Sequence, residues 1–535
     1  MKKLPVGIQS FREIVQGGYV YVDKTRYVYD LVNNAKYYFL SRPRRFGKSL
    51  FLDTIAEAFS SGRELFKGLW IYDSDYDFQT HPVLRLDMSG IANETPEVLK
   101  NSLASELRTR INAEGFDVSG EVASDLLKNL IEALYKKYGK RVVVLIDEYD
   151  KPILDHLHNT DMAEANRAVI RGFYGVLKSM DACLRFTFIT GVSKFTKTSI
   201  FSELNNLLDI TLIDDYANIC GIPVEDLDRC FHEHIEALSS LDRFKQYENI
   251  HDEILAWYDG YSWDGATRVL NPFGLLTFFA QKRFSSFWYS TGSPKFLIAM
   301  IRNNPESYTD FRDFEMGEWE LDSFDVNSIQ AAPLLFQTGY LTVREVLHGM
   351  GSTAYLLDIP NCEVREAFNL QMLAVLTERE NAFVGTAYRN ILKSLRDGDL
   401  NKILSVLKGF FASIPYNLHI PREAYYHSIF FTVMSLLGFD IEVEVATSKG
   451  RIDAVLEMKD KVYVFEFKYK DCDPGASAGA KRTLFDEALK EGLAQIIGRG
   501  YADKYLGSGK VVYQAAFAFL GMDDIEMKVE EIVET

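Results

Sequence analysis

In the first 215 residues, short apolar runs alternate with longer amphipathic stretches. The apolar runs have the length of buried strands, and segments such as 95–110 and 121–137 carry apolar side chains at helical spacing. Strands separated by helices are typical of a parallel sheet covered by helices. The pattern therefore predicts an α/β domain with five strands: Tyr37–Leu40, Val83–Met88, Val142–Ile146, Arg185–Ile189 and Leu208–Ile213.

Beyond residue 215 the pattern changes twice. Residues 216–410 are mostly helical in pattern, and two β-like runs, Tyr340–Val346 and Ala354–Ile359, are expected to form a hairpin after a helix, as in a winged-helix-like lid. A helix, a strand, a hairpin and another helix then lead to a final strand near Val511–Leu520. We therefore expect three domains: an α/β domain (1–215), a helical, winged-helix-like lid (216–410) and a smaller α/β domain (411–535).

The composition is that of a globular protein. Of the 535 residues, 47% are hydrophobic and 25% are charged, which excludes disordered and collagen-like classes. The five cysteines are widely spaced without a C-x-x-C pair, so they indicate neither a disulfide framework nor a thiolate zinc site, and a reducing compartment fits. Because no apolar run approaches the length of a membrane span, we expect a soluble cytoplasmic protein with no membrane partner.

The charge balance limits the class of partner. The formal net charge of −17 argues against a protein that coats nucleic acid non-specifically, because such proteins rely on a basic surface. Residues 421–520, however, contain 13 basic and 14 acidic side chains. A local basic groove in this stretch therefore stays open, and the partner has to be argued from individual sites.

Residues 42–49, with the sequence RPRRFGKS, follow the first predicted strand and precede an apolar-periodic helix at 50–59. A strand, a loop and a helix N-terminus are what a phosphate loop requires, because backbone N–H groups and the positive helix end converge on the anion. Lys48 would then reach the β- and γ-phosphates of ATP, and Ser49 would offer its hydroxyl to Mg²⁺.

The loop departs from the general phosphate-loop motif at its start. Arg42 replaces the first glycine, so the match is partial and a chance helix start is the alternative. Arg44 and Arg45 would add positive charge against a triphosphate. Together with Phe46 and Gly47, they complete the candidate nucleotide-binding loop.

A second candidate motif follows the third predicted strand, the buried apolar run at 142–146. Asp147 is placed to hold the water shell of Mg²⁺, and Glu148 to polarise the attacking water, as NTP hydrolysis requires. The alternative is a strand exit with solvated carboxylates, but both motifs in this order favour a nucleotide site. Thr190 and Ser193 follow the next strand and could sense the γ-phosphate, although a capping role is equally ordinary.

Near the C-terminus, two charged strands flank residues 458–461. If Lys459 and Asp460 form a two-residue turn, Asp453 lies opposite Glu466, and Lys468 projects from the same face. Cross-strand Cβ atoms are then about 5 Å apart, where two carboxylates repel unless a cation or a proton intervenes. The alternative is a solvated face with compensating charges.

Three valines, Val455, Val462 and Val464, lie on the same face as these charges. Their presence indicates that a helix partly covers the face, and partly buried charges need a partner. Two helical runs are candidates for that cover: an upstream run that begins at Glu423 and a downstream run that contains Gln495.

Five segments together resemble the AAA-ATPase-like proteins of bacteria and some archaea. They are Tyr21–Thr25, Arg42–Ser49, Ile146–Asp150, Trp257–Tyr261 and Asn271–Phe273. In these proteins the Arg-Pro-Arg-Arg form of the loop is usual, so Arg42 departs from general phosphate loops but not from these relatives. The resemblance implies an α/β fold with a P-loop NTPase parallel sheet that binds ATP and Mg²⁺.

The C-terminal order of elements, with Asp453, a Glu-x-Lys triplet and a later helix carrying Gln, resembles the PD-(D/E)XK nuclease superfamily. The resemblance implies a restriction-endonuclease-like α/β domain in which Asp453 and Glu466 bind Mg²⁺ or Mn²⁺. It also implies that Lys468 orients or deprotonates the attacking water, and that Gln495 and Glu423 assist, Glu423 at the metal. Oxygen ligands suit such an ion in phosphodiester cleavage.

The two candidate sites together predict an ATP-fuelled or ATP-gated nuclease that acts on DNA or RNA. The alternative is a nucleotide-regulated binding or scaffold protein whose nuclease fold has lost catalysis, or a defence or toxin-like component that is silent until triggered. No arginine finger is identifiable in the sequence. A homo-oligomer stays open for that reason, because arginines acting in trans would require one.

Overall fold

The computed structural model describes most of the chain, and the chain separates into two compact units, Met1–Phe296 with Phe311–Glu363 and Leu297–Asp310 with Val364–Thr535. The described residues are 1–194, 206–288, 314–321, 331–349, 353–377, 385–386, 389–391, 393–394, 397, 399–411, 441–447, 450–458, 460–473, 475–506, 509–520 and 524–532. The domain boundaries expected from the sequence stay a prediction. No helix in these ranges combines the length and apolar character needed to cross a bilayer.

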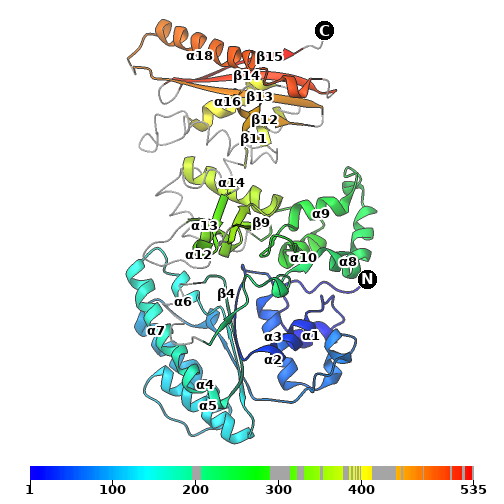
Figure 1. Ribbon diagram of the computed structural model, residues 1–535, viewed down its shortest axis with the longest axis vertical. Helices are drawn as coiled ribbons and strands as arrows, with labels where there is room; N and C mark the ends of the chain where they lie inside the picture. Colours follow the sequence, from blue (N-terminus) through cyan, green and yellow to red (C-terminus); the bar gives the residue numbers. More distant parts are fainter. Residues whose placement is uncertain are drawn as a thin grey trace. The chain divides into compact units, whose positions relative to one another are not determined.

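The first unit is built on a five-stranded, fully parallel sheet with the order β2-β3-β4-β1-β5 (Figure 1). All five strands predicted from the apolar runs are present, although the last one is shorter than expected. Their bounds are β1 Tyr37–Ser41, β2 Val83–Asp87, β3 Val142–Asp147, β4 Leu184–Gly191 and β5 Leu208–Asp209. The central strands are buried almost throughout, as continuous apolar runs in parallel sheets require.

Helices cover both faces of this sheet. In Figure 1, α4, α5 and α7 group on one side, and α1, α2 and α3 lie on the other. The bounds are α1 Phe11–Gln16, α2 Thr25–Asn34, α3 Lys48–Ser60, α4 Pro96–Ala113, α5 Ala123–Tyr138, α6 Lys151–Leu154 and α7 Thr160–Ser179. Local sequence explains several ends: the Thr95 hydroxyl accepts from the Val98 N–H at the start of α4, and left-handed Gly139 ends α5.

The rest of the first unit is a helical and hairpin region. Helices α8 Val224–Ser239, α9 Ile250–Tyr258 and α10 Pro272–Gln281 share one apolar cluster. Helix α13 is followed by the antiparallel pair β9–β10, which confirms the predicted hairpin after a helix, and β8 extends it on the other side of β10. Bounds here are β6 Ile222–Pro223, β7 Val269–Leu270, β8 Phe314–Gly317, α12 Glu318–Leu321, α13 Ala331–Thr338, β9 Thr342–His348 and β10 Thr353–Asp358.

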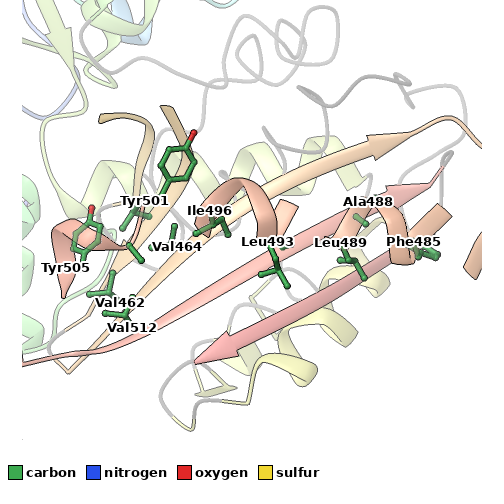
Figure 2. Close-up of a cluster of buried hydrophobic side chains, with 14 of the residues drawn as sticks. Val462, Val464, Phe485, Ala488, Leu489, Leu493, Ile496, Tyr501, Tyr505 and Val512 are labelled. Carbon is green, nitrogen blue, oxygen red and sulfur yellow. The ribbon is translucent and has the colours of Figure 1, made fainter. Parts of the chain in front are cut away.

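The second sheet has the order β11-β12-β13-β14-β15, and only the β13–β14 pair is parallel. Helix α18 connects these two strands and packs on the face that carries Val455, Val462 and Val464 (Figure 2). The helical cover predicted for that face is therefore confirmed. Bounds are α14 Cys362–Thr377, α16 Leu400–Phe411, β11 Ile441–Thr447, β12 Gly450–Glu457, β13 Lys461–Lys470, α18 Ala478–Gly498, β14 Val511–Leu520 and β15 Asp524–Ile532.

In the second unit, one expectation from the sequence is wrong and another falls outside the described residues. Strand β14 is not the last strand, because β15 adds an antiparallel edge whose apolar residues alternate with charged ones. The helical run that begins at Glu423 lies outside the described residues. Short 3₁₀ turns complete the chain: Arg63–Phe66, Trp70–Asp73, Met88–Gly90, Asp181–Cys183, Asp214–Tyr216, Asp242–Phe244 and Asp503–Tyr505.

Arg42, which stands where the general phosphate-loop motif has glycine, is a fully buried anchor. Its guanidinium donates to the main-chain oxygens of Ser41 (2.9 Å), Thr211 (2.9 Å) and Tyr216 (3.1 Å). It also lies 3.9 Å from the ring centroid of Trp263. Burial lowers the pKa of Arg42 to about 10, so the group is charged at neutral pH. The side chain thus ties the start of the loop to the segment that follows β5.

Replacing Arg42 is expected to destabilise the first unit without touching the exposed side of the loop. Arg42→Ala leaves three buried carbonyls without this donor, and each costs about 1–3 kcal/mol, so we expect a loss of about 3 kcal/mol or more in the free energy of unfolding. Urea unfolding followed by tryptophan fluorescence measures it, because all five tryptophans lie between Trp70 and Trp319.

Arg44→Ala is the matched control, since the Arg44 side chain is exposed in the same loop. Its unfolding free energy should change by no more than about 0.5 kcal/mol. Equal stability of the two variants would contradict the anchoring role of Arg42.

Candidate functional sites

The candidate phosphate loop spans the six residues between β1 and α3, as a strand-loop-helix phosphate site requires. Gly47, with a φ of +94°, is in the left-handed region that glycine adopts without strain, immediately before α3. The buried Lys48 ammonium donates to the main-chain oxygens of Arg42 (2.9 Å) and Pro43 (2.8 Å). Burial lowers the pKa of Lys48, and the charges of Asp147 and Glu148 oppose this shift. The loop therefore encloses the Lys48 ammonium close to the charges of two carboxylates.

Ser49 and Asp147 meet beside this cation. Ser49 is the second residue of α3, and Asp147 ends the buried strand β3. Their side chains are hydrogen-bonded, and burial raises the pKa of Asp147 although Ser49 and Lys48 favour its charged form. A hydroxyl and a carboxylate in contact are oxygen donors that suit Mg²⁺. The residues present therefore fit a Mg²⁺-nucleotide.

Glu148 follows directly and has an uncommon backbone. Its φ is +50°, a left-handed value that costs energy in a residue other than glycine, and its N–H donates to the Asp147 Oδ1 atom at 3.0 Å. Burial raises the pKa of Glu148, whereas Lys48 lowers it. A carboxyl group with a raised pKa beside the loop has the character of a general base.

Asp150 is a buried carboxylate that sequence reasoning did not single out. It accepts hydrogen bonds from the Val192 N–H (3.0 Å), the Ser193 N–H (2.6 Å) and the Ser193 hydroxyl (2.6 Å). Tyr149 donates to the Ser193 carbonyl at 3.0 Å. Tyr149 and Asp150 thus hold the backbone that follows β4. Their position directly after Asp147 and Glu148 in the Ile146–Asp150 motif was the signal in the sequence that could have identified them.

Thr190 and Ser193, the predicted γ-phosphate sensors, both have hydrogen-bond partners inside the protein. The buried Thr190 hydroxyl donates to the Leu40 carbonyl at 2.9 Å, and the Ser193 hydroxyl donates to Asp150. Both hydroxyls therefore hold the local backbone or a neighbouring side chain, which is closer to the capping role given as the alternative to γ-phosphate sensing. Contact with a phosphate stays a prediction.

The remaining loop side chains have different environments. Arg44 is exposed, and its carbonyl accepts from the Trp288 indole at 3.0 Å. The Arg45 guanidinium lies 4.0 Å from the Phe273 ring centroid. Phe46 is buried, with edge-to-face contacts to two aromatic rings of residues 261 and 263. Of these side chains, Arg44 has the most freedom to approach a phosphate.

A small pocket, partly open to solvent, adjoins Gly47 and is lined mainly by apolar side chains. Its one cation, Lys24, donates to the Asn218 carbonyl at 2.6 Å, and burial lowers the pKa of Lys24 to about 8. The Tyr21–Thr25 segment forms part of the wall. Lining residues are Pro5, Val20, Tyr21, Val22, Lys24, Phe46, Gly47, Leu50, Phe51, Ile219, Cys220, Gly221, Ile222, Phe231, Pro272 and Leu276.

The second candidate site lies on the β12–β13 hairpin, whose register is the one predicted from a two-residue turn. Ala454 pairs with Phe465, and Leu456 pairs with Tyr463. The Met458 N–H donates to the Lys461 carbonyl at 2.7 Å and closes the turn. Continued by one residue, this register sets Asp453 opposite Glu466.

Glu466 is the most buried charged group of this site. Its side chain is 1% exposed, its Oε1 atom accepts from the Lys468 ammonium at 2.9 Å, and its Oε2 atom has no hydrogen-bond partner within the described ranges. Asp453 is half-buried and accepts from the Phe467 N–H at 2.9 Å. Burial, followed by the charge of Asp453, raises the pKa of Glu466 to about 7 even though Lys468 opposes the shift.

This arrangement fits a divalent cation. An unpartnered buried carboxylate oxygen beside a second carboxylate leaves negative charge that Lys468 only partly compensates. Gln495 is half-buried on α18, the helix that covers this face, whereas Glu423 lies outside the described residues. Within the described part of the chain, no three His, Cys, Asp or Glu side chains are grouped as metal ligands, so the pair would supply two.

Comparisons with known proteins match the two sites separately. Residues 5–201 match the family described as "Predicted AAA-ATPase", and residues 421–528 match the PD-(D/E)XK nuclease superfamily. A relative from Azotobacter chroococcum mcd 1, described as "Uncharacterized protein in vnfD 5'region", is 38% identical over 524 residues, which cover 97% of this chain and 96% of the relative. No solved structure gives a significant match.

The raised pKa of Glu466 predicts how Mn²⁺ binding depends on pH. Since the ligand must be ionised, affinity should fall by up to about tenfold per pH unit below about pH 7 and level off above it. At about pH 6, binding should release about one proton. Calorimetry in buffers of different ionisation enthalpy measures both quantities.

The same shift has a stability consequence in the metal-free protein. Because the folded pKa of about 7 exceeds the ordinary value of 4.5, the contribution of Glu466 to the free energy of unfolding is fully present below pH 4.5 and is lost as the pH rises to about 7.

Glu466→Gln should abolish the pH-dependent part of Mn²⁺ binding. Glu457→Gln, at an exposed carboxylate of the same hairpin, should leave it unchanged.

Proposed function

This chain belongs to the AAA-ATPase-like proteins that carry a C-terminal PD-(D/E)XK nuclease superfamily domain, and we propose that it hydrolyses ATP and cleaves nucleic acid phosphodiesters. ATP turnover would fuel or gate cleavage. The observation that carries the nuclease half is the buried Glu466 oxygen without a partner beside Asp453. The contact between Ser49 and Asp147 next to Lys48 carries the ATPase half.

At the nucleotide site, each residue would act through its own chemistry. Lys48 would exchange its two carbonyl partners for phosphate oxygens, since an ammonium prefers an anionic acceptor. Ser49 and Asp147 would hold Mg²⁺, which neutralises charge on the phosphates. Glu148 would take the proton of the attacking water, and the apolar pocket next to Gly47 would receive the base.

At the hairpin site, Asp453 and Glu466 would hold Mg²⁺ or Mn²⁺, which supplies Lewis acidity toward the phosphodiester. Lys468, whose side chain is 14% exposed, would leave Glu466 Oε1 when the metal binds and would orient the attacking water. Gln495, on the covering helix, would assist at the same place. The substrate is therefore proposed to be DNA or RNA.

Lys48→Ala is expected to abolish ATP turnover, because it removes the cation that would bind the β- and γ-phosphates. Phosphate release measured with ATP and Mg²⁺ checks this. Lys67→Ala, at an exposed lysine outside the loop, should keep wild-type turnover. ATPase activity retained by Lys48→Ala would contradict the proposed site.

Asp453→Ala is expected to abolish metal-dependent cleavage, because one of the two proposed metal ligands is lost. Single- and double-stranded DNA and RNA should be incubated with Mn²⁺, with and without ATP, and resolved by electrophoresis. Asp460→Ala, at the exposed turn of the same hairpin, should cleave like the wild type.

A catalytically inactive nuclease fold that serves in regulated binding would give a different pattern. Such a protein would show no Mn²⁺ affinity that depends on Glu466. Cleavage by Asp453→Ala at the wild-type rate would contradict the nuclease half, while leaving the ATPase half to the Lys48 experiment.

A further inference from the structure

Helix α18 runs antiparallel to β13 across the face that carries the carboxylate pair. The Lys470 ammonium contacts the Glu491 carboxylate at 2.7 Å, and a Cβ atom added to Gly492 would lie 3.6 Å from the Lys468 Cγ atom. One turn further on, Ile496 packs in the cluster that contains Val464 (Figure 2). The last turn of α18 therefore lies over the strand near Glu466.

Arg499 directly follows this last turn. Its N–H donates to the Gln495 carbonyl at 3.1 Å, which continues the helical pattern. Arg499 is the C-cap residue of α18 and therefore stands at the end of the helix whose last turn packs on β13. The hydrogen bond that Arg499 donates to Tyr501, the Tyr501 hydroxyl itself, and then the charges of Glu466 and Asp453 raise the pKa of Arg499.

The guanidinium of Arg499 is positioned but exposed. Its Nη1 atom donates to the Tyr501 hydroxyl at 2.8 Å, and the Tyr501 ring is buried in the core under α18. Within the described ranges no carboxylate forms a salt bridge with Arg499. Three other cations on or next to this helix are ion-paired: Lys470 with Glu491, Lys481 with Asp524 and Arg482 with Asp486.

A cation near a helix C-terminus has an ordinary explanation, because it stabilises the last carbonyl groups. That explanation accounts for neither the anchoring by a buried tyrosine nor the position beside two carboxylates that fit a metal. An arginine has five N–H donors, and the Tyr501 hydroxyl uses one edge of the group. The guanidinium geometry matches a phosphate, which it can bind through two parallel hydrogen bonds.

We infer that Arg499 binds a backbone phosphate of the nucleic acid at the Asp453–Glu466 site, and so acts as a substrate-binding residue. This inference rests on the proposed nuclease function. The arginine neutralises a phosphate next to the metal-binding carboxylates, which would otherwise repel the substrate. Tyr501 is the positioning residue that holds the guanidinium in place.

The test separates phosphate binding from a structural role. The full-length protein is titrated with fluorescently labelled single-stranded DNA, duplex DNA and RNA in Ca²⁺ instead of Mg²⁺, and anisotropy is recorded at several KCl concentrations. Arg499→Gln should weaken binding about tenfold and lower the slope of log affinity against log salt by about one. Arg499→Lys should restore the slope, because it keeps the charge.

Arg482→Gln is the matched control. Arg482 lies on the same helix, about 25 Å further along its axis, and is exposed and paired with Asp486. It should keep the wild-type salt slope. A purely structural role of Arg499 would lower thermal stability and leave the slope unchanged.

The outcomes distinguish this inference from the proposed function. If the wild type binds nucleic acid and Arg499→Gln keeps its salt slope, the inference is wrong and the nuclease proposal stands. If the wild type binds none of the three nucleic acids, both are wrong. A slope that falls in Arg499→Gln and returns in Arg499→Lys supports the inference.

Discussion

The C-terminal unit depends on the electrostatic cost of holding Glu466 next to Asp453 in a buried hairpin. Two like charges at a cross-strand position repel, and burial makes each ionised carboxylate more expensive. The strand register enforces their meeting, because a slip by one residue would move one side chain to the opposite face of the sheet. Helix α18 then removes water from the same face by packing on its valines. A divalent cation would relieve the repulsion and would also give the unpartnered oxygen a partner, and this need is the physical basis of the nuclease proposal.

The N-terminal unit follows a different rule, in which buried polar residues hold the backbone around the candidate nucleotide site. Arg42 fixes the start of the loop through three carbonyls, and Asp150 fixes the backbone after β4 through three donors. Lys194, which follows the Ser193 held by Asp150, is ion-paired with Asp209 and donates its N–H to the Gln337 side chain of α13 at 2.8 Å. The strand ends beside Glu148 are therefore connected by hydrogen bonds to the helix before the β9–β10 hairpin.

Sequence reasoning located the elements that follow from local pattern. The five parallel strands, the β9–β10 hairpin and the register of β12 with β13 could all be predicted, because apolar runs and a two-residue turn determine them locally. Residues whose roles arise from distant partners could not. Nothing near Arg42 in the sequence indicates Thr211, Tyr216 or Trp263, and nothing near Arg499 indicates Glu466. Strand β15 was a missed local signal, because its apolar and charged residues alternate.

One divalent ion is proposed to bind both carboxylates of the hairpin. An anomalous difference map from a crystal of the full-length protein grown with Mn²⁺ tests it most directly. We expect a peak at coordination distance from oxygens of both Asp453 and Glu466, with the Lys468 ammonium displaced from the Glu466 Oε1 atom. A map without that peak, in which Lys468 still binds Glu466 at saturating Mn²⁺, would contradict metal binding by this pair.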